Sequence, residues 1–176
     1  MQNHKKLYTL TNIIIVFTIL MYLVQINVIN GDLYFGLNVY FFIDKLYYQA
    51  ISSMFTHGGV EHLAMNMIVL WQIGNILEQN IGKIRFIILY ILGGVLTSFG
   101  TLAYMYYFDD FSNVVGASGA ISVLFGYIAL KIKEQRAGMF IYIILISFVP
   151  LLFGMNIAWY SHLIGFAIGL IAGFVI

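Results

Sequence analysis

The sequence predicts an all-α, polytopic membrane protein with six transmembrane helices, and its composition and apolar runs favour this class. Of the 176 residues, 62% are apolar and 9% are charged, and the mean hydropathy is +0.95. A soluble globular domain carries about 25% charged residues, so water is not the only solvent of this chain. The chain has one proline, which leaves the apolar runs free to form helices.

Six runs without a charged residue are long enough, or nearly so, to cross a bilayer, for which a helix needs about 20 residues. They are residues 10–29, 63–77, 86–108, 114–130, 139–153 and 157–176. No linker rich in Pro, Gly or Ser divides them, so residues 1–176 are expected to form a single membrane domain. The first run could also be the core of a signal peptide. It is long for one, and no small-residue cleavage site follows it, so we favour a retained span.

The basic residues predict the orientation, because Lys and Arg accumulate in cytoplasmic loops. With the N-terminus in the cytoplasm, the split of basic residues is seven inside to one outside, and both termini are cytoplasmic. The seven are Lys5, Lys6, Lys83, Arg85, Lys131, Lys133 and Arg136, and the exception is Lys45. The aromatic-rich loop 31–56 is then external, and we expect it to lie partly in the outer interface. The aromatic residues of this loop could form an ordinary interfacial belt, or the loop could have a functional role.

The composition also excludes several partners. The net charge of +1 gives no reason to expect nucleic acid, and no P-loop or GxGxxG motif suggests a nucleotide. The chain has no cysteine, which excludes disulfides, thiolate zinc sites and cysteine nucleophiles. We expect neither a cofactor nor a metal.

Polar residues converge near the outer ends of three runs that all cross the membrane inward. His62 and Asn66 lie four residues apart near the start of the second run, on one helix face. Ser118 lies one turn into the fourth run, within Gly-Ala-Ser-Gly, and His162 lies near the start of the sixth. Topology therefore brings these four residues to a similar depth, where polar groups are costly and usually functional.

Small residues indicate which helix faces meet. Gly165, Gly169 and Gly173 follow His162 on its own face and form a smooth groove for a neighbouring helix. Ser122 and Gly126 continue the face of Ser118 in the same way. If these two faces pack together, the Ser118 hydroxyl comes within reach of the His162 ring.

This pairing predicts nucleophilic chemistry. A serine hydroxyl is a weak nucleophile until an adjacent base takes its proton, and imidazole suits that role. Gly116 and Gly119 would let a backbone approach closely and leave amides free to bind an oxyanion, to which His62 and Asn66 could also donate. No acidic residue lies at this depth, so a Ser–His dyad fits better than a triad.

Other interpretations of the same residues are open. A lone GxSG, a single membrane-depth histidine and an HxxxN pair can each serve helix packing alone. His57, His62 and His162 could bind zinc, but there is no HExxH motif and no carboxylate near His162. A transporter would usually show paired repeats, and we find none. The conjunction of the three elements at one depth favours the enzyme.

At these residues the chain resembles the rhomboid family of intramembrane serine proteases, over nearly its whole length. The resemblance is carried by residues 55–59, which read Phe-Thr-His-Gly-Gly, and residues 62–67, which read His-Leu-Ala-Met-Asn-Met. It is also carried by the Gly-Ala-Ser-Gly of residues 116–119, and by His162 with its three glycines.

The resemblance implies that Ser118 attacks the scissile carbonyl and that His162 is its base. It implies that His62, Asn66 and the Ser118 backbone amide stabilise the oxyanion. The substrate would be a transmembrane protein, cut near the external end of its span. The protein would be a multi-pass protein of the bacterial cytoplasmic membrane, and loop 31–56 would lie beside the active site.

The chain departs from the family pattern at three places. Tyr48-Gln49 stands where the family often has Trp-Arg, Ser122 stands where an aromatic residue commonly stacks on the histidine, and Ser161 replaces a commoner Ala. Another group must therefore position His162.

The alternative function is a catalytically silent module that binds transmembrane helices. Such relatives usually lack the serine or the histidine, and this chain has both.

Overall fold

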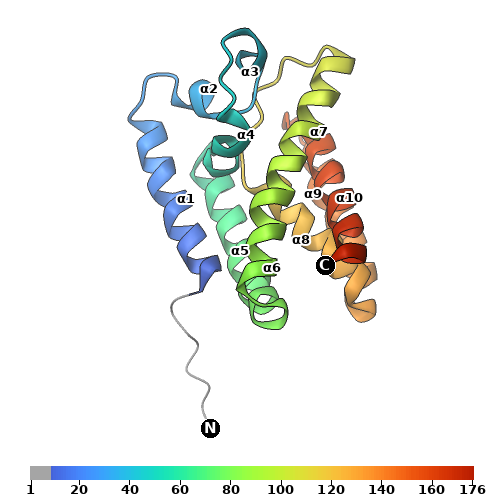
Figure 1. Ribbon diagram of the computed structural model, residues 1–176. Coiled ribbons are helices and arrows are strands. Elements are labelled where there is room, and N and C mark those ends of the chain that lie inside the picture. Colours follow the sequence, from blue (N-terminus) through green and yellow to red (C-terminus); the bar gives the residue numbers. More distant parts are fainter. Residues whose placement is uncertain (1–8) are drawn as a thin grey trace.

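Long helices occupy all six apolar runs in the computed structural model, which describes residues 9–176 (Figure 1). They are α1 (Leu10–Ile26), α5 (Val60–Ile81), α6 (Lys83–Ile87) continued by the π-helical turn η2 (Ile88–Leu92) and α7 (Gly93–Phe108), α8 (Ser118–Lys131), α9 (Arg136–Leu152) and α10 (Trp159–Val175). The short 3₁₀ turn η3 (Lys133–Gln135) joins α8 to α9. The all-helical class is confirmed for the described residues.

Two of the helical stretches, Lys83–Phe108 and Lys133–Leu152, are long and apolar enough by themselves to cross a membrane. Leu10–Ile26, Ser118–Lys131 and Trp159–Val175 are apolar but shorter. The count of six spans and the cytoplasmic position of both termini stay predictions. Two of the basic residues behind that orientation, Lys5 and Lys6, lie outside the described residues.

The fourth helix begins later than the fourth apolar run. Val114 forms an isolated antiparallel bridge with Leu37, with N···O distances of 2.9 and 2.8 Å. Gly116 has a φ of +123°, a value that glycine adopts readily and that does not occur in a right-handed α-helix. Residues 114–117 therefore precede α8, and Ser118 is the first residue of the helix and does not lie one turn inside it.

The segment between α1 and α5 contains four short helical turns, α2 (Gly31–Phe35), α3 (Tyr40–Ile43), α4 (Gln49–Ser52) and η1 (Ser53–Phe55). Gln49, which stands in the departure from the family pattern, is completely buried there. Its amide nitrogen donates to the carbonyl oxygens of Leu33 and Tyr34, at 3.1 and 3.2 Å. Gln49 thus ties the turns of this segment to one another.

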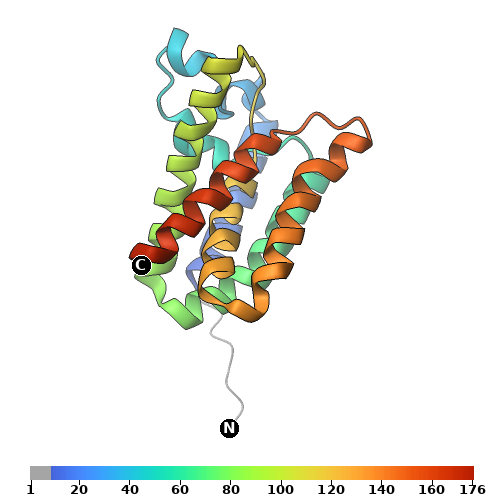
Figure 2. The ribbon, with the colours of Figure 1, turned by 90° about the vertical axis from the view of Figure 1, so that its right-hand side faces the viewer.

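Helix α8 lies at the centre of the bundle, and every residue from Gly119 to Ala129 is buried. Helix α10 lies against α8, whereas α9 stands to one side of both (Figure 2). Helix α9 buries only two side chains, those of Ile143 and Ser147. The bundle therefore has a tightly packed centre, whereas α9 leaves most of its side chains at least partly exposed.

Candidate active site

Ser118 and His162 are in hydrogen-bond contact. Ser118 opens α8, and His162 lies in the first turn of α10. The distance between the Ser118 Oγ and the His162 Nε2 is 2.9 Å. This is the separation that a nucleophile and its general base require. Because Ser118 is the first helical residue, its backbone N–H has no partner within the helix and is free to bind an anion.

Close contact between α8 and α10 makes this distance possible. A Cβ atom on Gly165 would lie 2.4 Å from the Gly119 carbonyl oxygen, and one on Gly169 would lie 2.0 Å from the Val123 carbonyl oxygen. Real Cβ atoms do not approach a backbone so closely, so any side chain at these positions would push the helices apart. The glycine face of α10 lies against α8 and sets the separation of the serine from the histidine.

His62 and Asn66 face the same site from α5. A Cβ atom on Gly116 would lie 2.7 Å from the His62 Cε1 and 2.9 Å from its Nε2, so the imidazole lies directly against the segment before Ser118. The Asn66 amide nitrogen donates to the His62 carbonyl oxygen at 2.9 Å, which leaves its second N–H available. Both residues line the cleft that contains Ser118 and His162.

This cleft has a volume of about 780 Å³ and is open along one side. Its long walls are apolar: Met65 and Val69 lie on α5, and Tyr142 and Ile146 lie on α9. Its charged lining residues are Asp32 and Glu61, and Glu61 belongs to the first turn of α5. The cleft therefore offers a largely apolar space beside the serine and the histidine.

His57 holds the segment before Ser118. The Ala117 N–H donates to the His57 Nε2 at 3.4 Å, and the His57 backbone is bound on both sides by Gln25, at 2.8 and 2.9 Å. His57 lies in the connection before α5 and is completely buried. Burial, and to a smaller extent the neighbouring His62, lower the pKa of His57 to about 3, so the ring is neutral and its Nε2 can accept the hydrogen bond from Ala117. From the sequence, His57 was considered as a metal ligand and as part of the motif of residues 55–59, and Gln25 was not singled out. A glutamine inside an apolar run was the available signal.

The described residues contain no group of three His, Cys, Asp or Glu side chains that could hold a metal ion. The rings of His57 and His62 lie 5.2 Å apart, in an edge-to-face arrangement. Their arrangement is that of two packed aromatic rings.

The second nitrogen of the His162 ring faces a residue that the sequence analysis missed. The Ser147 Oγ on α9 lies 3.5 Å from the His162 Nδ1. Ser122, one turn after Ser118, donates its hydroxyl to the Ser118 carbonyl oxygen at 2.7 Å. The Ser161 hydroxyl lies beside Gly119, 3.3 Å from where a Cβ atom would be. Of Ser122, Ser147 and Ser161, it is Ser147 whose hydroxyl contacts the His162 ring.

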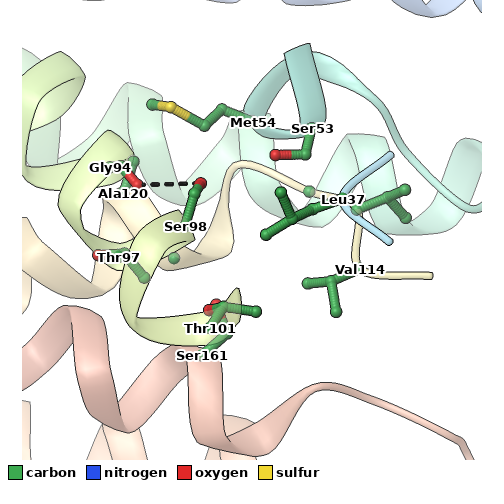
Figure 3. A pocket seen from close by; sticks show the side chains of 13 residues that line it. Leu37, Ser53, Met54, Gly94, Thr97, Ser98, Thr101, Val114, Ala120 and Ser161 are labelled. Atoms are coloured by element: carbon green, nitrogen blue, oxygen red, sulfur yellow. Dashed lines mark hydrogen bonds between the residues drawn. The ribbon is translucent and has the colours of Figure 1, made fainter. Parts of the chain in front are cut away.

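A small polar hollow of about 20 Å³ lies behind the segment before Ser118 (Figure 3). Thr97, Ser98 and Thr101 of α7 line one side, and Gly116 and Gly119 belong to the other. The Ser98 hydroxyl donates to the Gly94 carbonyl oxygen, as the dashed line in Figure 3 shows. The hollow has room for about one water molecule next to the glycines of the serine motif.

The fold and the site define a class: a bundle of apolar helices in which a serine and a histidine meet at the end of an apolar cleft. Comparison with known families identifies which one. The rhomboid domain matches residues 44–176, which is well over half of the chain. The chain belongs to the rhomboid family, whose members are embedded in membranes.

Several curated proteins are similar to the chain. RHOMBOID-like protein 4 of Arabidopsis thaliana is 34% identical over 138 residues, which cover 73% of this chain and 34% of that protein. The putative rhomboid protease YdcA of Bacillus subtilis is 29% identical over 136 residues, which cover 73% of this chain and 66% of that protein. The rhomboid protease GlpG of Klebsiella pneumoniae is 28% identical over 139 residues, which cover 73% of this chain and 48% of that protein.

The chain spans only part of the length of these relatives. A mitochondrial presenilin-associated rhomboid-like protein A of Danio rerio is 31% identical over 89 residues. These residues cover 51% of this chain and 23% of that protein.

Proposed function

We propose that the protein is an intramembrane serine endopeptidase that cleaves transmembrane proteins near the external end of their span. The observation that carries this proposal is the distance of 2.9 Å between the Ser118 Oγ and the His162 Nε2, inside an apolar cleft. The rhomboid family supports the proposal, because relatives of this chain include proteins named as rhomboid proteases.

In the proposed reaction the Ser118 Oγ attacks the scissile carbonyl carbon while its proton passes to the His162 Nε2. His162 then gives that proton to the leaving amine, and an acyl-enzyme remains on Ser118. A water molecule then attacks the ester carbonyl carbon while His162 takes its proton. The bond between the acyl carbon and the Ser118 Oγ breaks, His162 returns the proton to Oγ, and the new carboxyl end leaves. The polar hollow behind Gly116 offers a place from which such a water could come.

The developing oxyanion would be bound by the Ser118 backbone N–H at the start of α8, together with donors from His62 and Asn66. Donors held in place before the reaction stabilise the transition state without reorganisation. The loss of one such donor typically costs about 10²–10³ in kcat. Gly116 allows the His62 ring to lie against this position, because any side chain there would overlap the ring.

The substrate class follows from the walls of the cleft. The side chains that α5 and α9 contribute are mostly apolar, which suits an unfolded stretch of a transmembrane segment. Ser118 lies at the end of α8 opposite to Lys131. If the basic residues are cytoplasmic, the site opens toward the external side of a bacterial cytoplasmic membrane, and both termini lie inside.

The test is cleavage of a transmembrane substrate by the purified full chain in lipid vesicles. Ser118→Ala should abolish cleavage, and His162→Ala should lower it by about 10²–10⁴-fold, since a general base contributes that much. Thr18→Ala removes a buried hydroxyl on α1 that is bonded to its own helix, and it should cleave like the wild type. Cleavage that survives Ser118→Ala would contradict the proposal.

The apolar cleft alone would also suit a silent module that binds transmembrane helices and does not cut them. A serine-directed fluorophosphonate separates the two functions. A protease should be labelled at Ser118, and the label should be lost in Ser118→Ala and in His162→Ala. A binding module should retain its substrate helix without being labelled.

A further inference from the structure

A histidine that acts as a base through Nε2 must carry its proton on Nδ1. In the neutral ring one nitrogen donates and the other accepts, and the hydrogen bond of the second nitrogen decides which tautomer is present. In a Ser–His–Asp triad a carboxylate accepts from Nδ1–H and fixes both tautomer and ring orientation. The proposed dyad of this chain leaves that task to another group.

The Ser147 hydroxyl occupies the position of that group. Its Oγ lies 3.5 Å from the His162 Nδ1, on the side of the ring opposite to Ser118. Ser147 is completely buried, on a helix that otherwise buries only Ile143. A buried hydroxyl needs a hydrogen-bond partner, and the imidazole is the partner that the structure gives it.

A second hydroxyl of the site, that of Ser122, is occupied elsewhere. Ser122 takes the position where an aromatic residue commonly follows the nucleophile, and its hydroxyl is bonded to the Ser118 carbonyl oxygen. In the described part of the chain, the side chain in hydrogen-bond contact with the Nδ1 is that of Ser147. The Ser147 oxygen is therefore the side-chain acceptor that is in reach of a proton on Nδ1.

We propose that Ser147 is a positioning residue that accepts a hydrogen bond from the Nδ1–H of His162, an inference that rests on the proposed protease function. The Ser147 oxygen holds the proton on Nδ1, so that Nε2 is free to take the proton of Ser118. When Nε2 has been protonated, the Nδ1–H remains bonded to the same oxygen. No proton passes to Ser147 in any step.

A hydroxyl is a weaker partner than a carboxylate, so the expected effect is modest. The loss of one neutral hydrogen bond corresponds to a fall of about 3- to 10-fold in kcat for Ser147→Ala. Substrate binding does not involve the Nδ1, so KM should not change. Ser147→Thr keeps the hydroxyl, and it should restore most of the lost rate.

The matched control is Ile143→Val, which trims the other buried side chain of the same helix and leaves the hydroxyl in place. It loosens the attachment of α9 by about as much as a lost methylene costs. A structural role of α9 would give Ile143→Val and Ser147→Ala the same loss of rate. A positioning role predicts the loss in Ser147→Ala alone.

A second measurement reports the tautomer directly. The full chain is labelled with ¹⁵N-histidine, reconstituted in lipid and studied by NMR, and the His162 signals are identified by their absence in His162→Ala. The wild type should show the Nδ1-protonated tautomer, and Ser147→Ala should show a mixture of both. An unchanged kcat or an unchanged tautomer in Ser147→Ala would overturn the inference. If the wild type does not cleave and is not labelled at Ser118, the proposed function fails instead, and the NMR result still decides the contact.

Discussion

Replacement of Glu78 by alanine should strongly destabilise the fold without touching the candidate active site. Glu78 is buried near the end of α5. Its carboxylate accepts three hydrogen bonds, from the backbone N–H groups of Leu10 and Thr11 and from the Thr11 hydroxyl, each at 2.9 Å. These N–H groups belong to the first turn of α1, where no intrahelical acceptor exists.

The magnitude follows from these three bonds. Each hydrogen bond to a charged group contributes about 1.5–3 kcal/mol, and bonds to one carboxylate are not additive. The loss also removes a negative charge from the positive end of the α1 helix dipole. We expect a loss of about 3–5 kcal/mol in the free energy of unfolding. For a chain of this length that corresponds to a fall of roughly 10 °C in Tm.

Thermal unfolding of the purified protein in detergent micelles measures the effect. Glu78→Gln keeps an oxygen acceptor without the charge and should lie between the wild type and Glu78→Ala. Glu134→Ala, at an exposed site in the turn before α9, removes a carboxylate of the same kind and should leave Tm unchanged. Equal Tm values for Glu78→Ala and Glu134→Ala would refute the reasoning.

Two glycine substitutions test how the centre of the bundle is built. Gly126→Ala should lower Tm and abolish fluorophosphonate labelling, because its Cβ atom would lie 2.0 Å from the Phe166 carbonyl oxygen on α10. Gly138→Ala, on α9 in open space, is the control and should leave both measurements unchanged. Gly116→Ala combines a φ of +123° with a Cβ atom 2.7 Å from the His62 ring, so it should cost roughly 1–3 kcal/mol and most of the cleavage. Wild-type labelling of Gly126→Ala, or wild-type cleavage by Gly116→Ala, would contradict the geometry.

The helices could be predicted from the sequence because apolar runs are a local property. Each of the six runs contains a long helix, and five of the six helices begin within a few residues of the run. The fourth begins at Ser118 because Val114 pairs with Leu37. That pairing joins segments far apart in the chain, so no local pattern predicts it. Whether all six helices cross the membrane stays a prediction.

Some residues of the candidate site could likewise be predicted from the sequence, and others could not. Ser118 and His162 could be paired from sequence, since each follows from a helix direction and from a face of small residues. Gln25 and Ser147 could not, because each is one polar residue in an apolar run and its meaning depends on its partner. Gln25 gains its role from the His57 backbone, 32 residues away. Ser147 gains its role from His162, on another helix.

The uneven packing of the bundle bears on how the proposed dyad would work. The proposed nucleophile and base stand on α8 and α10, whose backbones are in direct contact, so the distance between Oγ and Nε2 is set by the close packing of these two helices. The contact to Nδ1 comes from α9, which buries two side chains and forms one wall of the cleft. A small displacement of α9 would therefore leave the pairing of Ser118 with His162 intact and break the contact of Ser147. In this arrangement glycines set the distance between Oγ and Nε2, whereas the tautomer of the proposed base would depend on the position of α9, which forms one wall of the cleft.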